Sequence, residues 1–177
     1  MKTELLIGCG SSREKRLTVD KTESFANLTT LDHNADHKPD IVWDLMHPDV
    51  LPFEDNSFDE IHAYEVLEHL GQQGDWRLFF KQFQRIWEVL KPGGHLLATC
   101  PSRHSPWAWG DPSHTRIMQH EQLAFLNQPA YTEQVGVTSM SDFRFCFTAD
   151  FDIVYSHDDK EAFRFILKAV KPSRITK

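Results

Sequence analysis

The sequence has few of the features that mark several large protein classes. Its three cysteines, Cys9, Cys100 and Cys146, form no CxxC pair, which argues against a disulfide framework or a structural zinc site. No stretch approaches the ~18 consecutive apolar residues of a membrane span, and the N-terminus has no signal-peptide core. Lys and Arg total 19 against 26 Asp and Glu, which argues against a nucleic-acid partner. We therefore expect a cytoplasmic protein with no membrane partner.

Hydrophobic residues make up 40% of the chain and charged residues 25%, as in a globular protein. The sequence shows no internal repeat, low-complexity segment or linker. A length of 177 residues favours one domain with a sizeable core. We therefore expect a single domain over residues 1–177.

Short apolar runs that end at turn residues predict seven β-strands. They cover residues 5–7, 27–31, 40–43, 58–64, 95–100, 151–155 and 162–170. Apolar side chains at helical spacing predict a long helix over residues 75–90, and a short helix is expected over residues 121–126. The short early connections predict compressed crossovers. The pattern as a whole indicates an α/β fold with a mostly parallel sheet.

Three successive strands end at residues suited to a ligand. Gly8-Cys9-Gly10 closes the first strand, Asp32 the second and Asp44 the third. The carboxyl ends of parallel strands share one edge, where glycines permit close approach and an acid can accept from ribose hydroxyls. Taken singly, each is an ordinary turn or cap, but the ordered set indicates a nucleoside-containing ligand. A nicotinamide-dependent oxidoreductase is disfavoured, because Arg13 replaces the last glycine of G-x-G-x-x-G.

A further polar group follows the fourth strand. Glu65, Glu68 and His69 have i, i+3 and i+4 spacing, which predicts one helical face with two carboxylates and an imidazole. The alternative is a solvated helix start, in which the helix dipole favours the glutamates.

These stretches together resemble the class I S-adenosylmethionine-dependent methyltransferases, in a small single-domain form. The resemblance rests on residues 6–10, 31–32, 40–45, 51–59, 65–69 and 90–94. It implies a Rossmann-like seven-stranded sheet of order 3-2-1-4-5-7-6, with strand 7 antiparallel and helices on both faces.

The resemblance also implies a set of cofactor-binding residues. They are Gly8, Cys9, Gly10, Asp32, Asp44, Leu45 and Glu65. Asp32 would hold the ribose, Asp44 with Leu45 the adenine, and the glycines and Glu65 the methionine end. The family's usual acid and third glycine are Leu6 and Ser12 here, which keeps open a degenerate binding or scaffold protein.

The Glu65-x-x-Glu68-His69 pattern resembles the metal-binding segment of O-methyltransferases of quinone biosynthesis and of small-RNA 3′ ends. That likeness implies Glu65, Glu68, His69 and His114 as ligands of Mg²⁺ or another divalent ion. It also implies His114 and Glu65 as catalytic residues, with His114 able to act as a metal-free base. In other members a similar run carries no metal, and there Glu68 and His69 would brace the helix.

The reaction that these residues predict is methyl transfer from S-adenosylmethionine. A hydroxyl of a small molecule or glycan is the expected acceptor, because the Glu/His group can activate an oxygen. An amine acceptor is the second possibility, and the non-catalytic scaffold is the third.

Overall fold

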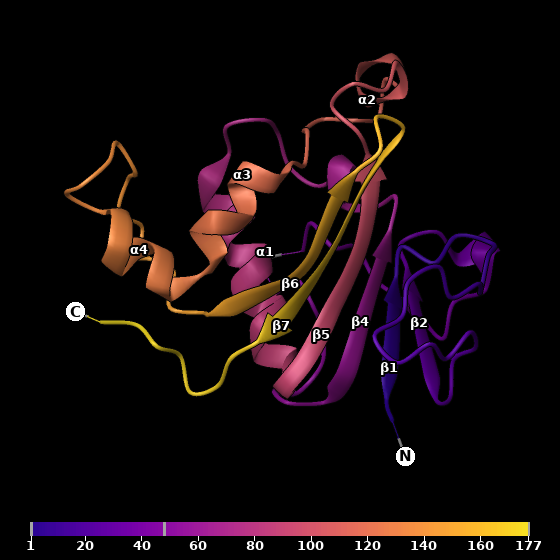
Figure 1. The fold of residues 1–177 in the computed structure, drawn as a ribbon. Coiled ribbons are helices and arrows are strands. Elements are labelled where there is room, and N and C mark those ends of the chain that lie inside the picture. Colours follow the sequence, from indigo (N-terminus) through magenta and orange to yellow (C-terminus); the bar gives the residue numbers. More distant parts are fainter. Residues whose placement is uncertain (1, 48, 177) are drawn as a thin grey trace.

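The computed structural model describes residues 2–47 and 49–176 and is built around one seven-stranded sheet (Figure 1). The strands are β1 (Glu4–Ile7), β2 (Leu28–Asp32), β3 (Ile41–Val42), β4 (Phe58–Tyr64), β5 (Leu90–Pro101), β6 (Phe151–Asp158) and β7 (Ala162–Ala169). Their order is β3-β2-β1-β4-β5-β7-β6. The strands from β3 to β5 in that order are parallel, and β7 is antiparallel to both its neighbours. The predicted order and the antiparallel seventh strand are confirmed.

Helices and single turns connect the strands. They are η1 (Ala35–His37), η2 (Leu67–His69), α1 (Trp76–Val89), α2 (Trp107–Gly110), α3 (His120–Leu123), η3 (Ala124–Leu126) and α4 (Gln128–Gln134). α1 begins where the Asp75 carboxylate accepts a hydrogen bond from the Leu78 amide (3.1 Å), and it buries Phe80, Phe83 and Ile86. The periodic apolar pattern therefore predicted α1 to within one residue at each end.

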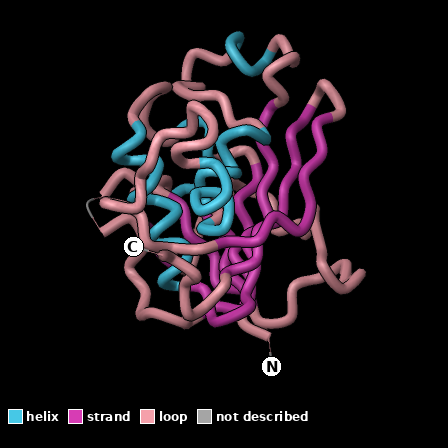
Figure 2. Tube along the Cα trace, turned by 60° about the vertical axis from the view of Figure 1, so that its left-hand side comes forward, coloured by secondary structure: helices cyan, strands magenta, loops and turns pink. Residues whose placement is uncertain are grey.

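The helices α1, α3 and η3 pack on one face of the sheet and α2 lies beyond the strand ends, whereas helices were expected on both faces (Figure 1 and Figure 2). The other face carries a small cluster around Leu6, and coil residues Leu17 and Phe25 pack on it. The crossover between β1 and β2 contains no helix in residues 11–27. Few of its residues are apolar and none recur at helical spacing, so the segment cannot form an amphipathic helix. The compressed early crossover is thus an extended strap.

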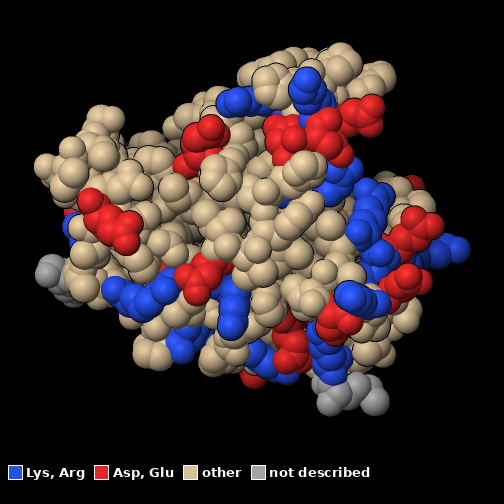
Figure 3. Space-filling view, viewed as in Figure 1, with Lys and Arg blue, Asp and Glu red and all other residues tan. Residues whose placement is uncertain are grey.

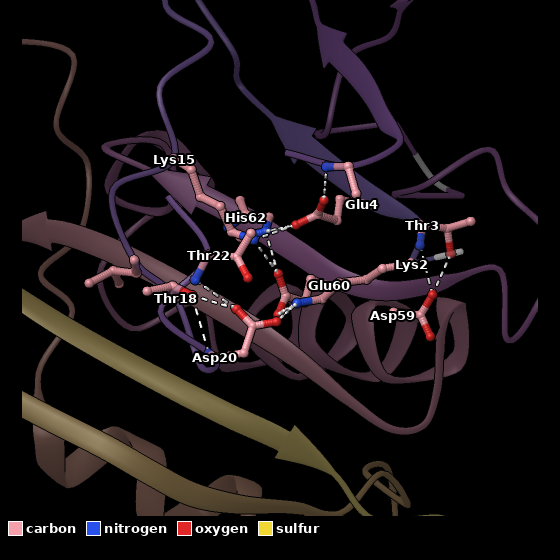
Figure 4. A network of polar contacts seen from close by, with 12 residues as sticks. Lys2, Thr3, Glu4, Lys15, Thr18, Asp20, Thr22, Asp59, Glu60 and His62 are labelled. Carbon is pink, nitrogen blue, oxygen red and sulfur yellow. Dashed lines mark hydrogen bonds and ion pairs between the residues drawn. The ribbon is translucent and has the colours of Figure 1, made fainter. Parts of the chain in front are cut away.

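The strap is held to the sheet by buried ion pairs (Figure 4). The Lys15 ammonium lies 2.5 Å from Glu4 Oε1 and 3.1 Å from Glu60 Oε2. Lys2 contacts the other Glu60 oxygen, and His62 Nε2 lies 3.2 Å from Glu60 Oε2. Because Glu4, Glu60 and His62 are almost fully buried, the lysines neutralise carboxylates that would otherwise be costly to bury.

Acidification is expected to destabilise the protein through His62. Burial lowers the pKa of His62 below its ordinary 6.5, so the unfolded chain takes up a proton that the folded chain resists. The stabilising contribution is complete above pH 6.5 and is lost as the pH falls toward the folded-state value, by up to ~1.4 kcal/mol per pH unit. Urea unfolding between pH 7.5 and pH 5 should show that the free energy of unfolding falls less steeply with pH in His62→Gln than in the native chain. The exposed His157→Gln serves as the control, and equal slopes in all three proteins would contradict the prediction.

None of the helices in residues 2–47 and 49–176 has the length and hydropathy needed to cross a bilayer. On the face in Figure 3, acidic and basic side chains are interspersed over the lower part of the molecule.

Candidate functional site

The turn after β1 combines one crowded glycine with one open glycine. Gly8 and Gly10 have φ angles of +58° and +51°, a region that costs other residues strain. A Cβ on Gly8 would lie 2.4 Å from Val66, whereas a Cβ on Gly10 would meet nothing within 4 Å. Gly8 thus permits the turn to pack against the end of β4, and Gly10 leaves space above the backbone for a ligand.

Asp32 joins the first two loops. Its Oδ2 accepts a hydrogen bond from the Gly10 amide (2.8 Å), and its Oδ1 accepts one from the Asn34 amide (2.8 Å). The Cys9 amide also bonds to the Leu31 carbonyl (3.2 Å), so the two strand ends are in contact. A carboxylate has about four acceptor positions. Asp32 therefore retains capacity for a pair of ligand hydroxyls, which fits the expected ribose.

The third loop lies beside the second, because the Trp43 amide donates to the Asp32 carbonyl (2.9 Å). Asp44 is exposed, and its Oδ1 accepts from the Met46 amide (2.8 Å). Leu45 is 6% exposed and its side chain packs in the main core, which leaves its backbone as the part that could meet the expected adenine. The three loop ends meet there, and Asp44 Oδ2 bonds to none of the described residues.

The sequence prediction missed the role of Arg13. Its guanidinium donates to the Gly10 carbonyl (2.8 Å) and to the His37 carbonyl (3.0 Å). Arg13 occupies the position of the last glycine in a G-x-G-x-x-G loop. In a dinucleotide-binding protein a helix begins at that loop. Here no helix follows, and the side chain braces the glycine turn against η1 instead.

Glu65 does not lie on a helix with Glu68 and His69, which corrects the i, i+3, i+4 interpretation. It has a φ of +55°, and the helical turn η2 begins only at Leu67. Its Oε1 accepts from the Thr99 hydroxyl (2.7 Å) at the end of β5. The left-handed turn therefore separates Glu65 from the ligand group that the sequence suggested.

Glu68, His69 and His114 do come together. One ligand atom of each lies within 4.8 Å of the others, although 45 residues separate the two histidines. His69 Nδ1 lies 3.2 Å from the Ser113 carbonyl and His114 Nδ1 lies 2.8 Å from the Trp107 carbonyl. Because a carbonyl only accepts, both Nδ1 atoms carry hydrogen. The Nε2 atom of each neutral ring is then free to bind a metal or a proton.

Glu68 is the unusual member of this cluster. It is 2% exposed, and neither carboxylate oxygen accepts a hydrogen bond from the described residues. Burial, with a smaller contribution from Glu65, raises the pKa of Glu68 to about 7. The Nε2 atom of His114 lies 4.0 Å from Glu68 Oε1. A buried carboxylate without a hydrogen bond is costly and calls for an explanation such as an ion. One carboxylate and two imidazoles are a suitable donor set for a divalent transition metal, and the residues fit such a group.

The order of the strands and the contact between the loops after β1, β2 and β3 are features of one class of protein. A family model described as a methyltransferase domain matches residues 5–98, more than half of the chain. The chain therefore belongs to this family, the class I S-adenosylmethionine-dependent methyltransferases.

Solved structures of similar fold agree with this assignment, whereas no curated protein sequence matches the chain. An S-adenosylmethionine-dependent methyltransferase of Archaeoglobus fulgidus has a TM-score of 0.57 and 16% identity, over 94% of this chain and 86% of that one. The N-methyltransferase NodS of Bradyrhizobium japonicum, solved with S-adenosylhomocysteine, scores 0.56 with 18% identity, over 95% and 78% of the chains. A Burkholderia thailandensis 1,6-didemethyltoxoflavin-N1-methyltransferase scores 0.58 with 14% identity, over 96% and 72%. At these identities the likeness establishes the fold.

Proposed function

We propose that this protein transfers the methyl group of S-adenosylmethionine to a hydroxyl of a small molecule or glycan. The Glu68–His69–His114 cluster is the observation that carries the choice of an oxygen acceptor. We further propose that residues 1–177 act as one domain in the cytoplasm. The single sheet supports the proposal of one domain.

The loops after β1, β2 and β3 would bind the methyl donor. S-adenosylmethionine supplies an electrophilic methyl group, so the protein has chiefly to hold and orient the reactants. Gly10 leaves space for the donor beside the turn, and Asp32 offers its remaining acceptor positions to the ribose. Asp44 would accept from the adenine amino group, as its exposure allows.

The cluster would prepare the acceptor. Glu68, His69 and His114 are the residues that would hold a divalent ion, and such an ion would lower the pKa of a bound hydroxyl. Without an ion, His114 is the candidate base, because the Trp107 carbonyl fixes its Nδ1–H and leaves Nε2 to take a proton. Glu65, tied to Thr99, would line the donor side and is not required as a ligand.

An amine acceptor is the second candidate. Two of the similar structures are named N-methyltransferases. An amine needs less activation than a hydroxyl, so methyl transfer that persists without the cluster would favour this alternative.

Calorimetric titration with S-adenosylmethionine tests the donor site. We expect binding to the native chain and at least ~100-fold weaker binding to Asp32→Ala, because hydrogen bonds to a carboxylate contribute about 1.5–3 kcal/mol each. Asp36→Ala, an exposed acid in η1, should bind as the native chain does. Circular dichroism should show that both variants are folded. No binding to the native chain at millimolar ligand would instead support a scaffold protein.

The chemical class of the acceptor can be tested by measuring methyl transfer from labelled S-adenosylmethionine to a panel of hydroxyl compounds and a panel of amines. We expect transfer to a hydroxyl compound and a strong reduction in EDTA. Full activity in the chelator would remove the metal and leave His114 as the base. Transfer only to amines would contradict the proposed oxygen acceptor.

A further inference from the structure

A cavity lies away from the donor loops. It has a volume of about 190 Å³ and lies between the start of α1 and the segment around α3. Its walls include five aromatic side chains and one arginine: Trp76, Phe79, Phe80, Phe125, Phe143 and Arg116. No residue of this lining belongs to the glycine turn or to the Glu68–His69–His114 cluster.

The aromatic rings of the cavity already pack against one another. Phe143 lies at the centre, with ring centroids 5.3 Å from Trp76, 4.7 Å from Phe80 and 5.9 Å from Phe125. An apolar cavity of about 150 Å³ can accommodate benzene, so this one has room for a small aromatic ring. The tilted and edge-on contacts are those that aromatic rings favour with a further ring.

Arg116 places a buried charge in this wall, with its guanidinium 5.6 Å from the centre of the Phe79 ring. It is 4% exposed, and no carboxylate of the described residues lies within ion-pair distance, 4.0 Å, of its guanidinium. Its Nε donates to the Leu67 carbonyl (2.9 Å) and one Nη atom donates to Gln82 Oε1 (2.8 Å). The remaining Nη atom bonds to none of the described residues and is not among the fully occluded polar atoms. A buried cation normally has an anionic partner, so this nitrogen is suited to receive one.

Two acidic residues near Arg116, Asp75 and Glu68, do not serve as its anionic partner. Asp75, which also lines the cavity, caps the first turn of α1 through its Oδ1. Glu68 is not part of the cavity lining, and its Oε1 lies 4.0 Å from His114 Nε2. Burial lowers the pKa of Arg116 to about 10, so the group stays charged near neutral pH but is poorly solvated.

We propose that this cavity is a binding site for a small aromatic carboxylate. The ring would pack among Trp76, Phe125 and Phe143, and the carboxylate would accept from the free nitrogen of Arg116. The site does not depend on methyl transfer, and its test needs no methyl donor.

The site is also connected to the cluster. The backbone amides of Thr115 and Arg116 donate to the Glu68 carbonyl (3.0 and 3.2 Å), and Arg116 Nε holds the Leu67 carbonyl. The same arginine therefore lines the cavity and fixes the turn η2 that carries Glu68 and His69. A ligand on Arg116 should be detected at the imidazole signals of His69 and His114.

Binding of matched probes to the full chain tests the proposal. Indole-3-carboxylate and indole-3-carboxamide have the same shape and differ in charge, and acetate provides the charge without the ring. Calorimetry should give a Kd near or below ~1 mM for the carboxylate. The carboxamide and acetate should each bind at least about tenfold more weakly. Equal binding of carboxylate and carboxamide would overturn the role of Arg116, and no binding of either at millimolar concentration would overturn the site.

Two variants and one control locate the binding. Arg116→Gln should weaken the carboxylate about tenfold or more without affecting the carboxamide. Phe125→Ala, which removes an aromatic wall and keeps the cation, should weaken both probes. Trp107→Ala removes an aromatic side chain that is 69% exposed and should leave binding unchanged. Native affinity in folded Phe125→Ala, verified by its melting curve, would place the probe elsewhere and contradict the proposal.

Discussion

Replacing Glu68 by leucine is expected to make the protein more stable in EDTA and to abolish its response to divalent ions. The native carboxylate is 2% exposed and accepts no hydrogen bond from the described residues, so its ionised form is costly in the metal-free protein. A leucine of similar size removes that cost. We expect a gain of roughly 1–3 kcal/mol in the free energy of unfolding, measured by urea titration with EDTA present.

The same variant separates stability from function. Mn²⁺ should raise the melting temperature of the native chain, because a ligand that binds only the folded state stabilises it. The Glu68→Leu chain should show no such rise and should lose methyl transfer if the ion takes part. Glu121→Leu, at a side chain that is 65% exposed, provides the control and should keep the Mn²⁺ response. A Glu68→Leu chain that is less stable than the native chain in EDTA would mean that the carboxylate is already satisfied within the fold.

Placing alanine at Gly8 should cost far more stability than placing it at Gly10. Both positions have positive φ, which costs alanine about 1–2 kcal/mol. Only at Gly8 would the new Cβ approach a side chain, at 2.4 Å from Val66, and such overpacking adds about 1–3 kcal/mol. Gly10→Ala should therefore lose about 1–2 kcal/mol, and Gly8→Ala several kcal/mol, out of the 5–15 kcal/mol typical of a domain.

A double-mutant cycle isolates the contact from the strain. In the Gly8→Ala, Val66→Ala chain the closest overlap, with Val66 Cγ2 at 2.4 Å, is removed, while the contact with the Cβ of residue 66 at 2.8 Å and the φ strain persist. The double variant should thus lose less stability than the two single changes added together. Strict additivity in urea unfolding would show that Val66 moves aside and that strain alone accounts for the loss. Equal stabilities of the Gly8 and Gly10 variants would contradict the close packing of the turn.

Most of the fold could be read from local patterns. The strand positions and α1 follow from apolar runs and helical periodicity, because burial of one face imposes those periods on the sequence. α2 and α4, with four and seven residues, carry no such periodic pattern and were not predicted. The missing helix between β1 and β2 shows the limit of the family resemblance. The resemblance implied helices on both faces, whereas the local residues favour a strap.

The candidate site was predicted in parts. Gly8, Gly10, Asp32 and Asp44 could be placed together because parallel strands bring their carboxyl ends to one edge. The Glu65 interpretation was wrong because it assumed a helix directly after β4. A left-handed residue at that position turns the chain and directs the carboxylate to Thr99.

The sequence by itself determined the strand order through its resemblance, the long helix, and the polar residues at three strand ends. These depend on short-range periodicity and on a topology that many related chains share. Only the tertiary structure decided which side chains meet across distance: His114 with Glu68 and His69, Arg13 with the glycine turn, and Arg116 with the aromatic cavity. Such contacts depend on where a loop folds back onto the sheet edge, and no local spacing along the chain encodes that path.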